Sequence, residues 1–164
     1  MKFMKITPFP DQTTPESNRF VDDYLLYELA VASQLLSDEF HRYVKSQGVK
    51  IHCWRVLACL IDQPGLMLTD LSHLVLFEQS RLTKIIDQMA ADELVSKQSD
   101  PKDRRKTALS VTQKGADIVG PLIIKAKEHE ARALSVLTAR ERVSFKKTLR
   151  KLGKIHGSIS VNDR

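Results

Sequence analysis

The spacing of apolar residues predicts a long first helix that follows an extended arm. Three prolines lie among polar residues in positions 1–17, and this composition favours a flexible arm over a helix. From about residue 18 to residue 44, apolar residues recur at intervals of three and four, as they do on a helix with one buried face. We expect this face to consist of Val21, Leu25, Leu29, Ala32, Leu36, Phe40 and Tyr43.

Three shorter helices are predicted in the next stretch. A helix over about 51–61 ends at the Gln-Pro-Gly sequence of residues 63–65, which is typical of a turn. A short helix follows over 70–75, and Thr69 is its expected N-cap because a threonine hydroxyl can accept from the first unpaired amides. The fourth helix covers about 79–93. Its expected inward stripe consists of Leu82, Ile85, Ile86 and Met89.

The period of the apolar pattern falls to about two after residue 93. Residues 94–99 and 107–111 are therefore predicted to form the strands of a β-hairpin around the polar turn 100–103. Two short helices joined by a tight turn and followed by a hairpin are the order of a winged helix-turn-helix, whose second helix enters the DNA major groove. We therefore expect residues 79–93 to be a DNA-reading helix.

Two more helices are predicted after the hairpin. The fifth follows Thr112 and contains Gly120 and Pro121, where a kink is expected because proline lacks a backbone donor. The sixth opens with a capping box from Thr138 to Glu141 and continues to about residue 155. Its apolar stripe lies outside the DNA-reading unit and needs a covering surface. The stripe consists of Val143, Leu149, Leu152 and Ile155.

The polar side chains off the apolar stripe of residues 79–93 are candidates for DNA contacts. Arginine can donate twice to guanine, and glutamine can pair with adenine. Hydroxyls and lysines suit phosphate or mixed contacts. The candidates are Arg81 for guanine, Gln79 or Gln88 for adenine, and Ser80, Thr83 and Lys84 for phosphates or mixed contacts.

The predicted hairpin is strongly basic. Five cations oppose two anions in it, which leaves a local net charge of +3. A wing with this charge is expected to lie along phosphates, and an arginine at its tip suits a narrow minor groove. The cations are Lys97, Lys102, Arg104, Arg105 and Lys106, and the anions are Asp100 and Asp103.

Composition narrows the class of protein. The net charge of +6 favours a polyanionic partner, and 42% apolar residues suffice for a core without metal or disulfide. No apolar segment has the length of a signal peptide or a membrane span, so we expect a cytoplasmic protein that has no membrane partner. We find no phosphate loop, metal-ligand spacing or nucleophile motif, which predicts that the chain is not an enzyme and holds no cofactor.

A segment of the sequence resembles a known family. Residues 94–115, LVSKQSDPKDRRKTALSVTQKG, are similar to the wing and the start of the next helix in the multiple-antibiotic-resistance regulator (MarR) family of bacterial repressors. WRVL at residues 54–57 and SRLTK at residues 80–84 resemble its second and recognition helices. The resemblance extends from about Arg19 to the C-terminal end. It implies a mainly α fold with a small β-wing.

The resemblance also assigns roles within the wing. It implies that Asp103 and Arg105 hold the wing together through a carboxylate–guanidinium pair, while Arg104 reaches the groove. The chain departs from the family at two turns where the family often has glycine. It has Leu76–Phe77 before the recognition helix and Glu93 before the wing.

The family pairs its N- and C-terminal helices across a two-fold axis, which implies a homodimer on a palindromic operator. Residues 11–40 carry seven acids and one base, and residues 140–157 carry seven bases and one acid. These segments either attract each other across the dimer interface or are solvated helix faces. The expected domains are a flexible arm over 1–17, dimerisation helices over 18–45 and 112–164, and a winged helix-turn-helix over 48–111.

Members of the family commonly release DNA when a small phenolic or anionic molecule binds between the dimer helices and the DNA lobe. The resemblance therefore implies a repressor with a cleft for an aromatic or phenolic acid, or its thioester, bordered by the first, second and fifth helices. Such a ligand needs apolar walls and a cation or donor. The candidates are Arg55 first, then His52, Trp54, Tyr24, His41 and His129.

Two alternatives remain open at this point. Cys53 or Cys59 could act as a thiolate sensor of oxidants, although both lie in an apolar helix, where a buried structural role is expected. Their spacing of six prevents pairing within one helix. A winged-helix module that binds protein instead of DNA is the other alternative, and the basic wing argues against it.

Overall fold

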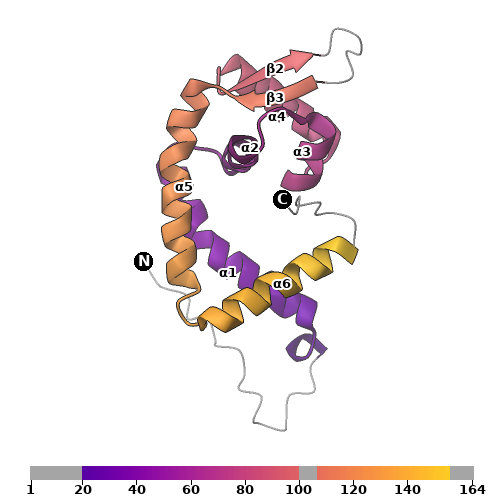
Figure 1. Ribbon diagram of the computed structural model, residues 1–164, viewed down its shortest axis with the longest axis vertical. Coiled ribbons are helices and arrows are strands. Elements are labelled where there is room, and N and C mark those ends of the chain that lie inside the picture. The colour runs from indigo at the N-terminus through magenta and orange to yellow at the C-terminus, as the bar shows by residue number, and fades with distance from the viewer. Residues whose placement is uncertain (1–19, 100–106, 156–164) are drawn as a thin grey trace. The chain divides into compact units, whose positions relative to one another are not determined.

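The computed structural model describes residues 20–99 and 107–155. Contacts divide the chain into two units, residues 1–39 and residues 40–164, and the first long helix runs through both. The elements are a 3-10 turn (Phe20–Asp22), α1 (Leu25–Ser46), α2 (Ile51–Asp62), β1 (Leu66–Met67), α3 (Leu68–Val75), α4 (Gln79–Ala91), β2 (Val95–Ser99), β3 (Thr107–Val111), α5 (Gln113–Ala133) and α6 (Ala139–Ile155), as labelled in Figure 1.

The predicted order of helices and strands is confirmed, with two differences at helix starts. The first long helix begins at Leu25 instead of about residue 18, after the separate 3-10 turn. The third helix begins at Leu68, and its N-cap is Met67 in an extended conformation. The prediction of Thr69 as N-cap is therefore wrong. The physical reason is the short strand β1, which leads directly into α3 and which the sequence pattern did not reveal.

The sheet has three antiparallel strands in the order β1-β3-β2. The hairpin aligns Val95 with Val111 and Ser99 with Thr107, while Leu66 of β1 aligns with Leu109 of β3. Leu109 is fully buried at the centre of the sheet. The wing is thus anchored by a third strand that precedes the helix-turn-helix in sequence.

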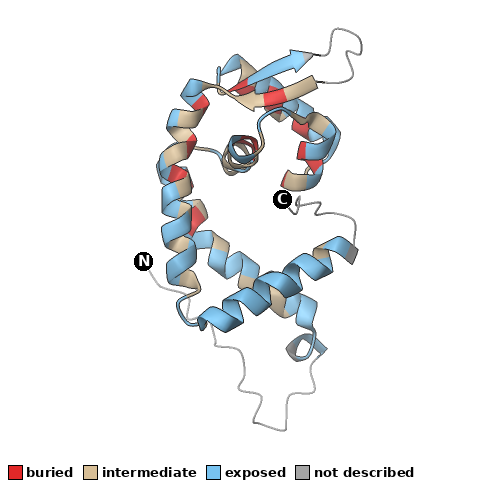
Figure 2. Cartoon of the chain, viewed as in Figure 1, coloured by how far each residue is buried: buried red, intermediate tan, exposed pale blue. Residues whose placement is uncertain are grey.

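The main hydrophobic core joins α2, α3, α4, α5 and the sheet. The predicted inward stripe of α4 is confirmed, because Leu82, Ile86 and Met89 are buried and Ile85 is partly buried. Figure 2 shows further buried residues, in red, on α2, α5 and the sheet. Burial of one face of α4 fixes the rotation of the helix, so the opposite face must lie in solvent. The other buried members are Val56, Leu57, Leu60, Leu71, Val75, Val95, Leu109 and Val119.

A smaller cluster joins the C-terminal end of α1 to α5. It consists of Phe40, Val44 and Leu122, with Trp54 of α2 packed against both this cluster and the main core. The ring of Phe40 meets the ring of Trp54 edge-on, with centroids 5.1 Å apart. His129 lies on Phe40 as well, at 5.8 Å between centroids.

The two C-terminal helices begin where the sequence predicts them, and each has a capped N-terminus. The Thr112 side chain accepts a hydrogen bond from the Gly115 amide at 3.1 Å. At α6, the Glu141 carboxylate accepts from the Thr138 amide at 2.7 Å, and the Thr138 hydroxyl accepts from the Glu141 amide at 3.3 Å. This reciprocal pair is a capping box. Pro121 lies inside α5, as expected.

Much of the apolar stripe expected to be buried on the first helix is exposed. Phe40 is buried, whereas Val21, Leu25 and Leu36 are exposed, so the prediction of one continuous buried face is wrong for a single chain. Apolar spacing marks a face that needs a covering surface, and it does not say which chain supplies that surface.

Within the described residues, no helix combines the length and apolar composition needed to cross a bilayer. The same residues hold no group of three or more potential metal ligands.

Candidate nucleic-acid interface

The face of α4 opposite its buried stripe is polar and basic. Its first turn holds no acid, and Arg81 and Lys84 extend from its N-terminal half. Unpaired amides at a helix N-terminus add positive partial charge, so this end of α4 favours phosphate. All six predicted contact residues of the helix are exposed, namely Gln79, Ser80, Arg81, Thr83, Lys84 and Gln88.

Two of these side chains already donate hydrogen bonds within the chain. The Thr83 hydroxyl donates to the Gln79 carbonyl at 2.8 Å, and the Gln88 amide donates to the Asp92 carboxylate at 3.0 Å. The Gln88 amide nitrogen has a second hydrogen, so it can donate to adenine while this bond is kept. Thr83 is thus held by the backbone of its own helix and Gln88 by the residue after that helix.

Both ends of α4 are set by residues in the left-handed region. Leu76, after α3, has φ 57°, and Glu93, before β2, has φ 59°. These are the two positions where the chain departs from the glycine-containing turns of the family it resembles. Left-handed backbone costs a residue with a Cβ roughly 1–2 kcal/mol. The chain keeps both turns despite this cost, so the sharp reversals around α4 are retained.

One predicted phosphate contact of the wing is held by a carboxylate. The Lys97 ammonium of β2 lies 2.7 Å from the Asp87 carboxylate of α4. Both side chains are exposed, so the pair adds little to stability. It nevertheless links the hairpin to the recognition helix and lowers the positive charge between them. Asp87 could not be found from the sequence, because no local pattern connects two residues that meet across a turn.

The other predicted wing cations lie outside the described residues. They are Lys102, Arg104, Arg105 and Lys106, and Asp103 lies there too. Their assignments to DNA and to the Asp103–Arg105 pair stay predictions.

Replacing Asp87 with asparagine is expected to strengthen binding to random-sequence duplex DNA several-fold at low salt. The substitution removes one negative charge and releases the Lys97 ammonium for phosphate, and each phosphate contact adds to the salt dependence. Fluorescence anisotropy at several salt concentrations measures the effect. Glu78→Gln is the matched control, since it removes an equal charge at the exposed N-cap of α4 without releasing a lysine. If the slope of log affinity against log salt concentration is the same in both variants, the Lys97–Asp87 pair has no role in DNA binding.

Comparisons with known proteins agree with this architecture. The model of the MarR family matches residues 52–107, which run from α2 through the wing. The HTH-type transcriptional repressor NicR of Pseudomonas putida is 33% identical over 75 residues, which are 46% of this chain and 48% of the repressor. The chain therefore spans about half the length of that relative.

The crystal structure of a MarR family transcriptional regulator from Silicibacter pomeroyi matches far more of the chain. It is 41% identical, with a TM-score of 0.74, and the match covers 84% of this chain and 98% of that one. The chain belongs to the MarR family. BpsR of Bordetella bronchiseptica, at 24% identity over 84% of this chain and 97% of its own, has a TM-score of 0.72 and shares the MarR fold.

Two of the residues predicted to line a MarR ligand cleft pack on the same ring. Trp54 and His129 both pack on Phe40, so these two are brought together. His52 instead lies near the cations Lys50 and Arg81. Burial lowers the pKa of His52, and these two charges lower it further. The remaining candidates differ in setting: Arg55 is exposed, His41 is half-buried, and Tyr24 lies in the unit formed by residues 1–39.

Both cysteines of this MarR chain are free thiols and half-buried in α2. Burial raises the pKa of Cys53 and of Cys59. The Lys50 charge partly offsets this increase at Cys53, while Asp92 at Cys53 and Asp62 at Cys59 add to it. The reactive thiolate is therefore scarcer at neutral pH than in an ordinary cysteine. This environment favours a packing role over oxidant sensing.

Proposed function

We propose that this MarR family chain is a homodimeric, sequence-specific DNA-binding transcription regulator of the cytoplasm. We further propose that it is a repressor, released from a palindromic operator by a small aromatic or phenolic acid or its thioester. The observation that carries the proposal is α4, whose buried Leu82 and Ile86 fix the helix so that Arg81 and Lys84 face solvent. A basic hairpin follows this helix directly, as DNA reading by a winged helix-turn-helix requires.

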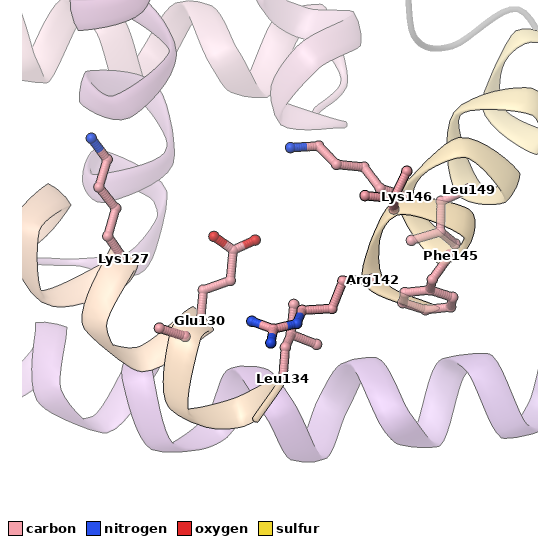
Figure 3. Close-up of a pocket in the computed structure, with 9 residues that line it drawn as sticks. Lys127, Glu130, Leu134, Arg142, Phe145, Lys146 and Leu149 are labelled. Carbon is pink, nitrogen blue, oxygen red and sulfur yellow. The ribbon is translucent and has the colours of Figure 1, made fainter. Parts of the chain in front are cut away.

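The exposed apolar face of α6 supports the dimer. Phe145, Leu149 and Leu152 lie on one side of α6 and are 37–44% exposed, whereas Val143, which is 70% exposed, lies on the other side of the helix. A cleft of about 440 Å³ separates α6 from the end of α5, where Leu134 contributes to an apolar lining. Figure 3 shows Lys127 and Glu130 extending from α5, and Arg142, Phe145, Lys146 and Leu149 from α6. A face of this kind is suited to a second copy of the chain.

Charge also supports this arrangement. Within the described residues, positions 20–39 hold five acids and no lysine or arginine, while α6 holds seven bases and one acid. An acidic segment of one subunit would neutralise the basic helix of its partner and steer the two subunits together. Apolar contacts would then supply the stability, because exposed ion pairs add little.

The ligand part of the proposal draws on the solved relatives. The DNA binding of BpsR, which shares the fold, is regulated by 6-hydroxynicotinic acid. Heteroaromatic and phenolic acids are therefore the first ligands to test. Release of bound duplex by such an acid, and not by its neutral amide, is the expected result for a site that contains a cation.

Salt dependence of duplex binding tests the proposed function. Duplexes are first selected from a random pool, and their affinity is then measured between 50 and 200 mM salt. For 6–10 phosphate contacts, affinity is expected to fall by about 10³–10⁵ over this range. A flat response would contradict DNA binding and favour a protein-binding module. A selected sequence without two-fold symmetry would contradict a symmetric dimer on the operator.

A further inference from the structure

The turn between α3 and α4 holds an aromatic ring in a fixed position. The Phe77 amide donates to the Ser72 carbonyl at 3.2 Å, which ties its backbone to the end of α3. The ring is half-buried and packs against the main core. Because Glu78 is the N-cap of α4, Phe77 takes the preceding position, where an apolar side chain typically packs under the first turns of a helix. Phe77 is thus constrained at both its backbone and its ring.

The guanidinium of Arg81 lies over this ring. Its central carbon is 4.7 Å from the centroid of Phe77, within the distance of a cation–π contact. Arg81 is the third residue of α4 and is exposed, so the arginine sits where a recognition helix meets base edges. The ring supports one face of the guanidinium and leaves its edge toward solvent.

The kind of support matters for DNA reading. A carboxylate partner would occupy the N–H donors of arginine, whereas an aromatic ring touches only the face of the guanidinium. Among the described residues, Arg81 makes no ion pair with a carboxylate. The imidazole of His52 on α2 lies near its guanidinium, and that positive charge helps to lower the pKa of His52. All five donors therefore remain at the edge of the group. Two of them are the donors that pair with O6 and N7 of guanine.

We propose that Phe77 is a positioning residue that holds Arg81 ready to read a guanine in each operator half-site. The inference rests on the proposed function, because it requires α4 to enter the major groove. It goes further by assigning a specificity role to an apolar residue outside the recognition helix. A ring that restrains Arg81 before binding reduces the rotamer freedom that the side chain must lose on DNA.

The test compares binding to a selected operator and to random duplex for four proteins: wild type, Phe77→Leu, Arg81→Ala and the double variant. Leucine keeps an apolar side chain but has no π face. Phe77→Leu is expected to lower the ratio of operator to random affinity by about 2- to 5-fold. Arg81→Ala is expected to lower the ratio by about 5- to 150-fold. In the Arg81→Ala background, Phe77→Leu is expected to change nothing further.

Two additional measurements separate positioning from folding. Phe77→Tyr retains the ring and is expected to restore the wild-type ratio. Replacing the contacted guanine with 7-deazaguanine removes N7, and this change is expected to weaken wild type more than Phe77→Leu. The inference is overturned if Phe77→Leu lowers operator affinity equally in the wild-type and Arg81→Ala backgrounds. It is also overturned if Phe77→Leu lowers the affinities for operator and random DNA equally. Wild-type protein that binds no duplex would instead overturn the proposed function.

Discussion

Replacing Gly115 with alanine is expected to destabilise the folded chain by about 3 kcal/mol, at the upper end of the cost of overpacking. A Cβ at this position would lie 2.2 Å from the Leu94 carbonyl oxygen and 2.8 Å from a methyl of Val111. The first of these contacts involves backbone, so no change of rotamer relieves it. Urea unfolding at fixed protein concentration measures the loss as a lower midpoint.

The clash is severe because the start of α5 is fixed against the start of the hairpin. The Thr112 amide donates to the Leu94 carbonyl at 3.1 Å, and the Thr112 hydroxyl donates to the Glu93 carbonyl at 2.6 Å. Gly120→Ala is the matched control, since a Cβ there meets no atom within 4 Å apart from its chain neighbours and the backbone of its own helix. Removing a mid-helix glycine stabilises a helix, but Pro121 follows and disfavours helical backbone for a residue with a Cβ, so only a small change of the urea midpoint is expected. Similar midpoints for the two alanine variants would show that α5 can move away from Leu94.

Replacing Leu149 and Leu152 together with asparagine is expected to weaken the proposed dimer by at least 100-fold. Each dimer loses four apolar side chains from its interface, and full burial of one leucine contributes roughly 1.5–3 kcal/mol. Both residues are exposed in the single chain, so its helix content and core should remain intact. Sedimentation velocity over a range of concentrations measures the shift to monomer. Operator affinity should fall as the dimer dissociates, because a monomer binds only one half-site at a time.

Lys147→Ala provides the control for this pair of substitutions. Lys147 is exposed on α6 and lies about 200° around the helix from Leu149, on the opposite side. The proposed interface should tolerate its loss. A double asparagine variant that remains dimeric would show that α6 is not the covering surface.

The elements of the fold could be predicted wherever local chemistry decides them. Thr138 and Glu141 form the capping box expected from their spacing, and Thr112 caps α5 through its hydroxyl. The failed prediction of Thr69 as a cap has a non-local cause. The two residues before α3 pair with β3, which lies forty residues further along the chain, and that pairing sets the helix start.

The candidate site could be predicted to the level of faces but not of contacts. Helical spacing alone places Arg81 and Lys84 on the side of α4 away from the core, and both are exposed. It cannot show that Lys97 meets Asp87, since that pair depends on the packing of the hairpin against α4. It also cannot show that Arg81 stacks on Phe77, because the sequence does not give the path of the turn between them.

The only tryptophan of the chain lies where two hydrophobic clusters meet. Trp54 contacts the main hydrophobic core on one side and Phe40 of the smaller cluster on the other. The fluorescence of its indole therefore reports on the contact between the main core and the smaller cluster. Binding or unfolding that rearranges this junction can be followed in unlabelled protein by the colour and intensity of a single fluorophore.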